Sequence, residues 1–174
     1  MAGSLIKIDE EIVTSSVASV TLTGIDSTYD VYMVKINGYL NSTSSAQRLR
    51  VTVGGTPDTT ANYDFAGKFL RTDIAFTNGS ATNGTEGQYS GNLTASQPNA
   101  GNHILYLYNW NNSSEYSFWS FETTGYYDNS ASDFLAGHQG GGVHTVAQSC
   151  DGIQFFSSSG NITGGTFTLY GLKK

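Results

Sequence analysis

Residues 103–124 read HILYLYNWNNSSEYSFWSFETT. Aromatic or aliphatic residues recur at every second position in two segments of this stretch. Ile104, Tyr106, Tyr108 and Trp110 share one face of the first segment, and in the second Trp119 and Phe121 face one way while Tyr116 and Phe118 face the other. A period of two is the period of a β-strand. Because Asn and Ser at positions 111–114 supply turn chemistry between the segments, the sequence predicts an antiparallel hairpin.

Shorter alternating segments lie on both sides of this hairpin, separated by turns rich in Gly, Asn and Ser. They cover residues 17–22, 31–40, 48–53, 153–156 and 166–172. Strong helix formers are sparse, and a 13% aromatic content supplies apolar surface for a core. A parallel sheet would need crossover helices, which the sequence does not offer. We therefore predict an all-β fold, an antiparallel and jelly-roll-like β-sandwich of about 8–10 short strands with long polar loops.

The length of 174 residues suits a single domain spanning residues 1–174, in which residues 1–15 form an N-terminal arm or an edge strand. Two regions are expected to be mainly loops. Residues 77–101 contain few apolar side chains and offer one short strand near Gln88. Residues 126–142 are polar and glycine-rich, and Gly140–Gly142 are expected to form a flexible break.

Charge and composition exclude several classes of function. The net charge is −6, from 8 basic and 14 acidic residues, so a nucleic-acid partner is not expected. The basic clusters are Arg48 with Arg50 and Lys173 with Lys174. No segment reaches the roughly 18 apolar residues of a membrane span, and we expect neither a span nor a signal peptide. Because the sequence has a single cysteine, no internal disulfide is expected.

The residues with catalytic or metal-binding chemistry do not form a convincing site. His138, His144 and Cys150 lack the close ligand pairs of structural zinc sites and are expected to be polar residues of a mobile loop. Nothing marks Cys150 as an activated nucleophile. Glu115 and Glu122 are seven positions apart, so a regular strand points them to opposite faces and they do not form a glycosidase pair. The sequence predicts no catalytic residue, no metal site and no cofactor, and thus not an enzyme.

Surface contacts are a more promising kind of site. Tyr126 and Tyr127 lie in a polar stretch, and together with His138 and His144 they are candidates for glycan or receptor contact. The tryptophans are expected to fill the core instead. The apolar N-terminal residues Leu5, Ile6 and Ile8 are candidates for docking to a capsid or another partner.

Two stretches resemble the structural proteins of tailed-bacteriophage virions. Residues 151–162, DGIQFFSSSGNI, followed by residues 164–172, GGTFTLYGL, are similar to the last hairpin of many such proteins. Residues 20–33, VTLTGIDSTYDVYM, look like their opening strands. Together these stretches cover about a quarter of the chain, and nothing in residues 58–101 carries the resemblance.

The resemblance implies a small β-sandwich used as a particle component. We expect a capsid decoration (cement) protein on the outer surface of the virion, made in the host cytoplasm. It would contact the major capsid protein and itself, as a homotrimer. One alternative is the receptor-binding tip of a tail or head fibre, which would bind host-surface glycan through residues 125–129 or 133–144. A second alternative is a carbohydrate-binding module.

Overall fold

The computed structural model describes residues 4–98, 101–128 and 132–172, so the basic pair Lys173–Lys174 lies outside the described residues. Within these ranges the chain forms thirteen β-strands and no helix. The strands are β1 (Leu5–Val13), β2 (Ser19–Thr23), β3 (Val31–Asn41), β4 (Ser45–Val53), β5 (Thr56–Pro57), β6 (Tyr63–Arg71), β7 (Thr77–Gly84), β8 (Gly87–Leu93), β9 (Gly101–Tyr108), β10 (Ser117–Tyr127), β11 (Phe134–His144), β12 (Gly152–Ser157) and β13 (Ile162–Leu172). The predicted all-β antiparallel sandwich is confirmed, with more strands than expected.

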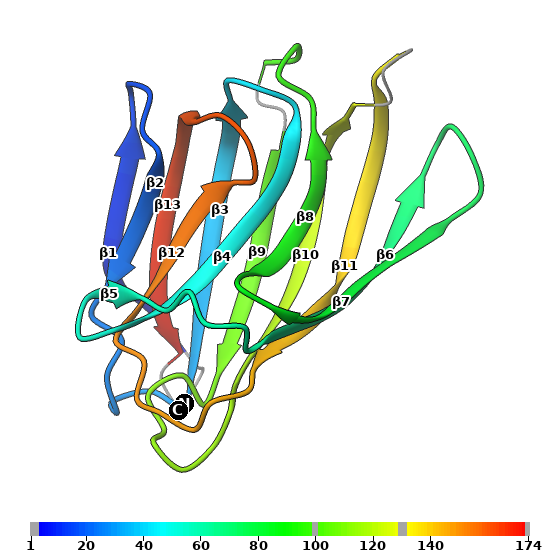
Figure 1. The fold of residues 1–174 in the computed structure, drawn as a ribbon. Coiled ribbons are helices and arrows are strands. Elements are labelled where there is room, and N and C mark those ends of the chain that lie inside the picture. The colour runs from blue at the N-terminus through cyan, green and yellow to red at the C-terminus, as the bar shows by residue number, and fades with distance from the viewer. Residues whose placement is uncertain (1–3, 99–100, 129–131, 173–174) are drawn as a thin grey trace.

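Eight of the strands form two four-stranded arrays that face each other (Figure 1). One has the order β1-β13-β3-β9 and the other the order β2-β12-β4-β8, and all pairings are antiparallel. Strands from the two ends of the chain therefore alternate within each sheet. The two facing arrays form a β-sandwich, and the finer classification as a jelly roll stays a prediction.

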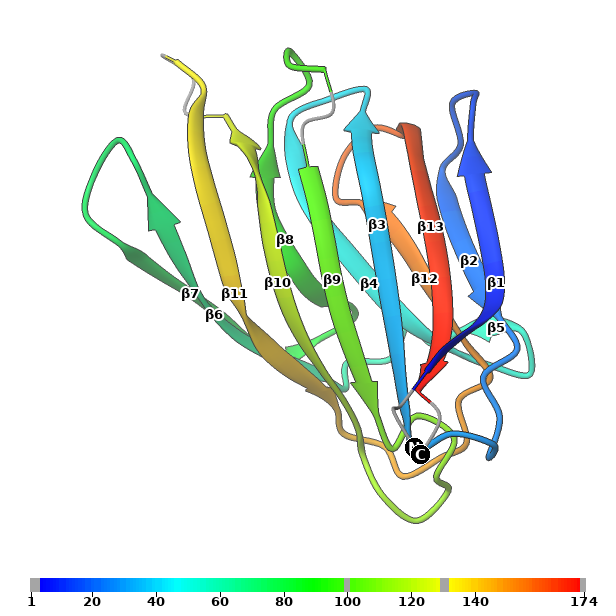
Figure 2. The ribbon, with the colours of Figure 1, turned by 180° about the vertical axis from the view of Figure 1, so that it is seen from behind.

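Two insertions widen one of the sheets. Strands β6 and β7 follow the short β5, which pairs with β4 in the smaller sheet, and β10 and β11 follow β9. β10 pairs with β9, β11 with β10, β6 with β11 and β7 with β6. The larger sheet thus runs β1-β13-β3-β9-β10-β11-β6-β7, and Figure 2 looks onto its outer face. β10 also pairs with β8 at Tyr127 and Leu93, which joins the two sheets.

The core lies between the two sheets and is filled by every second residue of their strands. Fully buried members include Leu22, Val34, Leu49, Leu105, Phe155 and Phe167. Aromatic rings meet edge to face, as in the pair Tyr89–Phe155 with centroids 5.4 Å apart. Trp110 and Trp119 are 1% and 2% exposed, which confirms that both tryptophans fill the core.

The glycine triplet is part of a regular strand. Gly140–Gly142 lie within β11 and pair with β10 on one side and β6 on the other. A Cβ on Gly142 would fall inside the Trp119 indole, so glycine here allows an aromatic ring to lie against the strand. The prediction of a flexible break is wrong because these glycines serve close approach rather than a turn.

The two predicted loop regions are also largely strands. Residues 77–101 contain β7, β8 and the start of β9, while β10 extends to Tyr127 and β11 begins at Phe134. A strand pairs through its backbone, so Asn, Ser, Thr and Gly suffice where its side chains face water, as most of those of β7 do. The weak apolar pattern therefore hid these strands.

The N-terminal segment forms an edge strand. β1 pairs with β13, and the register of this pairing shifts between Lys7 and Asp9. Ile8 lies at this irregularity and is partly buried against the core. Leu5 and Ile6 are 50% and 40% exposed. At the opposite edge, β7 pairs with β6.

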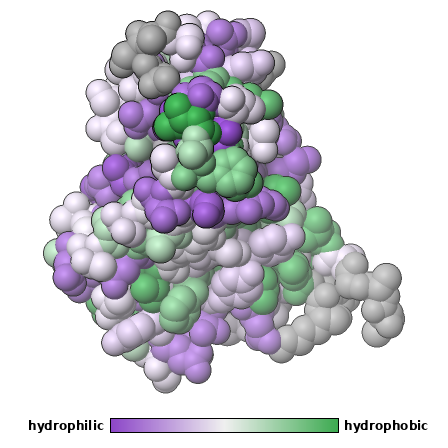
Figure 3. Space-filling view, turned by 90° about the vertical axis from the view of Figure 1, so that its right-hand side faces the viewer, coloured by the Kyte–Doolittle hydropathy of each residue, from purple (hydrophilic) through white to green (hydrophobic). Residues whose placement is uncertain are grey.

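The loop between β6 and β7 carries two exposed hydrophobic side chains, Ile74 and Phe76. Figure 3, which looks at the molecule from the side of these strands, shows a small hydrophobic area surrounded by hydrophilic surface. At the base of the loop, Arg71 pairs with Asp73 at 2.7 Å and lies 4.2 Å from the centroid of the Phe134 ring.

Candidate functional site

The outer face of the larger sheet brings polar side chains into rows across β3, β9, β10 and β11. The register places Ile104 beside Lys35 on one side and Glu122 on the other, and Gln139 beside Glu122. Neighbouring strands lie about 4.8 Å apart. The row is therefore a fixed set of one cation, one aliphatic group, one carboxylate and one amide.

Exposed aromatic side chains lie farther along the same face, in the next two register rows. Tyr106 and Tyr108 are each 37% exposed on β9, and Phe118 is 44% exposed on β10. Ile104, Tyr106 and Tyr108 thus share a face as the sequence predicted, and it is the outer face. Trp110 departs from that face: it follows Asn109, whose φ of 57° ends the alternation, and it turns into the core.

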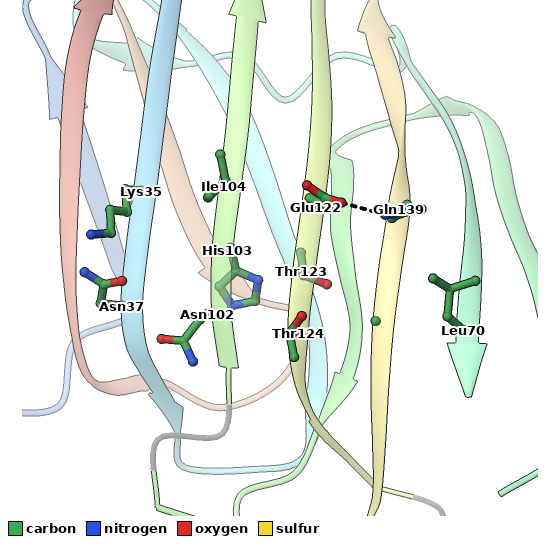
Figure 4. Close-up of a pocket in the computed structure, with 11 residues that line it drawn as sticks. Lys35, Asn37, Leu70, Asn102, His103, Ile104, Glu122, Thr123, Thr124 and Gln139 are labelled. Atoms are coloured by element: carbon green, nitrogen blue, oxygen red, sulfur yellow. Dashed lines mark hydrogen bonds between the residues drawn. The ribbon is translucent and has the colours of Figure 1, made fainter. Parts of the chain in front are cut away.

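A hollow of about 310 Å³ lies over these strands (Figure 4). Its lining includes Lys35, Asn37, Asn102, Ile104, Glu122, Thr124 and Gln139. Gly137 stands in the same register row as Thr124 and Asn102. Because glycine has no side chain, that position leaves space between Thr124 and Leu70, which pair with Gly137 on either side.

The polar groups of the hollow are partly held in place by the protein itself. Gln139 Nε2 donates a hydrogen bond of 2.6 Å to Glu122 Oε1. Asn102 Oδ1 accepts one of 3.0 Å from the Gly38 N–H. Each contact uses only part of the hydrogen-bonding capacity of the side chain. The second carboxylate oxygen of Glu122 and the amide nitrogen of Asn102 stay available to a ligand.

A neighbouring hollow of about 250 Å³ extends this surface toward Tyr106 and Ser120. Ile104, Glu122 and Gln139 line both hollows. Ser120 and the Tyr108 hydroxyl share a hydrogen bond of 3.2 Å. The site is thus an elongated surface with a polar part and an aromatic part.

His103 lies beneath the hollow with its side chain in the core. It is 2% exposed, and neither ring nitrogen has a hydrogen-bond partner among the described residues. Burial lowers the pKa of His103 to about 3, so the imidazole is neutral near pH 7. It packs edge to face on Tyr39 and Tyr89.

The residues predicted to contact a glycan do not form a common surface. Tyr126 is 45% exposed, but Tyr127 is 1% exposed, and its hydroxyl shares hydrogen bonds with Ser90 and Thr123. His138 is fully buried on β11 and stacks on Phe69 with centroids 4.0 Å apart. The contact assigned to Tyr127 and His138 is therefore wrong, because side chains alternate across a strand and theirs point inward.

His144 is buried as well, so its assignment to a surface contact is also wrong. Its Nε2 lies 3.1 Å from Asp58 Oδ2, which also accepts a hydrogen bond from Gln148. Burial lowers the pKa of His144, and the nearby carboxylate opposes this shift. Among the described residues, no three His, Cys, Asp or Glu side chains gather where they would hold a metal ion.

Cys150 is fully buried beside Ser117, whose Oγ lies 3.7 Å from its Sγ. Burial raises the pKa of the thiol to about 11. We expect the folded protein to resist a thiol reagent such as Ellman's reagent at pH 8 and to react stoichiometrically in denaturant. Rapid labelling of the native protein at this pH would contradict the buried, protonated thiol.

The three predicted docking residues are partly available at the surface. Leu5 and Ile6 are exposed on β1. Ile8 instead packs against the core and lies close to Gly24. Ile12, which the sequence analysis did not single out, is 61% exposed on the same strand. The available apolar surface of β1 is therefore that of Leu5, Ile6 and Ile12.

The hollow was missed by sequence reasoning because its residues come from five strands, β3, β6, β9, β10 and β11. A local signal existed in the hairpin of β9 and β10, where the alternation that buries Trp119 and Phe121 turns Glu122 outward. Gln139 joins it from the next strand, β11, which the glycine-rich sequence did not mark as a strand. Lys35 lies beyond Ile104 on β3, and that pairing is distant in sequence.

No helix long and apolar enough for a membrane crossing occurs in the part of the chain that the structure describes. A scan against protein-family models gives no match, and a search of curated proteins finds no relative of this sequence.

Proposed function

We propose that this chain is a non-enzymatic structural subunit of a tailed-bacteriophage particle, a decoration protein on the outer capsid surface. The residues that resemble phage virion proteins support this proposal by their place in the fold. They form β12 with its partner β2, and β13 with its partner β3. They are thus part of the eight-strand framework, while residues 58–101 mainly supply inserted strands and loops.

The observation that carries the proposal is the edge strand β1, whose exposed apolar side chains lie among the charged residues Lys7, Asp9, Glu10 and Glu11. It exposes Leu5, Ile6 and Ile12, and hydrogen-bonds to β13 along one side. An edge strand offers backbone donors and acceptors to a further strand, and apolar side chains add contact area. The proposed partner is the major capsid protein, with a second copy of this chain in a homotrimer as a further contact.

The role would be mechanical. A subunit that bridges neighbours across a shell gains from repetition, because many weak contacts act together. The fibre tip and the carbohydrate-binding module remain alternative proposals, and both require a surface site for a sugar.

A capsid-binding experiment tests the proposal. Added protein is expected to bind capsids that lack it and to raise their melting temperature. Ile6→Asp combined with Ile12→Asp is expected to weaken binding at least about tenfold, since each aspartate places a charge in an apolar contact.

Ile74→Asp is the matched control, because Ile74 is 54% exposed in the β6–β7 loop, away from β1. The control should bind like the wild type. An unchanged melting temperature of the capsids after the protein is added would argue against a decoration role. Equal binding by the double variant would argue against β1 as the docking edge.

A further inference from the structure

The outer face of the larger sheet carries a surface built for a ligand longer than a single small group. The two hollows, of about 310 and 250 Å³, meet at Ile104, Glu122 and Gln139. The first lies at the lower end of the size range of small-molecule sites. An extended chain lying across β9, β10 and β11 would contact both.

The polar groups there suit a neutral, hydroxyl-rich ligand. Lys35 and Glu122 offset each other, and the same register row continues to Lys68 beyond Gln139 and to Glu10 beyond Lys35 and Thr168. Anion sites gather several cations or backbone N–H groups, whereas this row alternates charges with amide and hydroxyl groups. Hydroxyl groups both donate and accept, as such a mixed row requires.

Tyr106 gives this surface an apolar platform beside the polar row. Its ring is 37% exposed on the outer face of β9, two positions from Ile104, and it lines the second hollow. An aromatic ring next to hydrogen-bonding groups matches a pyranose ring, which has an apolar face of C–H groups and a rim of hydroxyls.

The site is also largely formed before any ligand arrives. Its residues stand on strands, and the Gln139–Glu122 hydrogen bond fixes two of its polar groups. Side chains that are already positioned lose less entropy on binding.

We propose that this surface binds a neutral oligosaccharide of at least two sugar units. Tyr106 stacks on one ring, and Glu122, Gln139 and Asn102 hydrogen-bond to hydroxyls of the next. The site goes beyond the proposed docking role of β1 and lies on different strands, so the two are tested separately.

The test uses hexasaccharides of glucose, of N-acetylglucosamine and of mannose, with heparin as an anionic probe. Isothermal titration calorimetry of the full chain is expected to detect binding of at least one neutral hexasaccharide. Tyr106→Ala and Glu122→Gln should each weaken that binding at least about tenfold, which corresponds to about 1.4 kcal/mol.

Phe76→Ala is the matched control, because Phe76 is a more exposed aromatic residue, 60% against 37%, and lines neither hollow. It should bind within twofold of the wild type, and near-UV circular dichroism should show all variants folded. The proposal is overturned if no neutral hexasaccharide binds, if heparin is the sole binder, or if the Phe76 variant loses as much affinity as the Tyr106 variant. Capsid binding by the same preparations is measured separately, because the docking proposal concerns β1 and can fail while oligosaccharide binding is observed, or the reverse.

Discussion

Lowering the pH from 7 to 5 is expected to reduce the free energy of unfolding by about 4 kcal/mol, about 2 kcal/mol for each of two buried histidines. Burial lowers the pKa of His103 to about 3 and that of His138 to about 4, from an ordinary value of 6.5. The unfolded chain therefore takes up protons between pH 7 and 5, while the folded chain does not. Stability is fully present above the unfolded pKa and is lost as the pH falls toward the folded pKa.

Urea denaturation at pH 7, 6 and 5 measures this effect. The interval ends above both folded pKa values, so the expected loss depends little on their precise position. His138→Leu should remove about half of the pH dependence, whatever its effect at pH 7. A wild-type protein equally stable at pH 7 and 5 would show that the two imidazoles are protonated or hydrated in the folded state.

Gly142→Ala is expected to destabilise the fold by about 3 kcal/mol, the upper part of the usual cost of overpacking. The new Cβ would overlap the Trp119 ring and press on the Asp64 carbonyl, and both belong to the packed sheet. Thermal or urea unfolding measures the loss.

Gly79→Ala is the control, since a Cβ at Gly79 on the edge strand β7 meets nothing within 4 Å. It should change stability by less than about 1 kcal/mol, and a gain is expected because alanine restricts the unfolded chain. If both substitutions cost the same, glycine content rather than close approach explains the triplet.

The sequence reveals the framework strands because one face of each is buried in the core. Burial alternates along β9 and β10, although the outer face of β9 is itself apolar. In β13, Phe167 and Leu169 are buried as the alternation predicts. The sequence does not reveal β7, whose side chains mostly face water, or β11, in which glycines replace the apolar residues that would mark a strand.

The histidines were misplaced for a related reason. A glycine-rich segment with polar residues resembles a loop. Phe134, Ala136 and His138 nevertheless stand at every second position and all face the core. The hollow was out of reach for two reasons: β3 meets β9 through a pairing distant in sequence, and β11, although it follows β10 directly, was not recognised as a strand.

The position of β13 between β1 and β3 sets an order on folding. These two N-terminal strands have no direct pairing with each other, so their part of the larger sheet stays open until residues 162–172 have been synthesised. Closure of that sheet must therefore follow the synthesis of residues 162–172. Such long-range pairing makes folding slow. Until the pairing is complete, the exposed apolar side chains of β1 and β3 are prone to aggregation and need protection by chaperones.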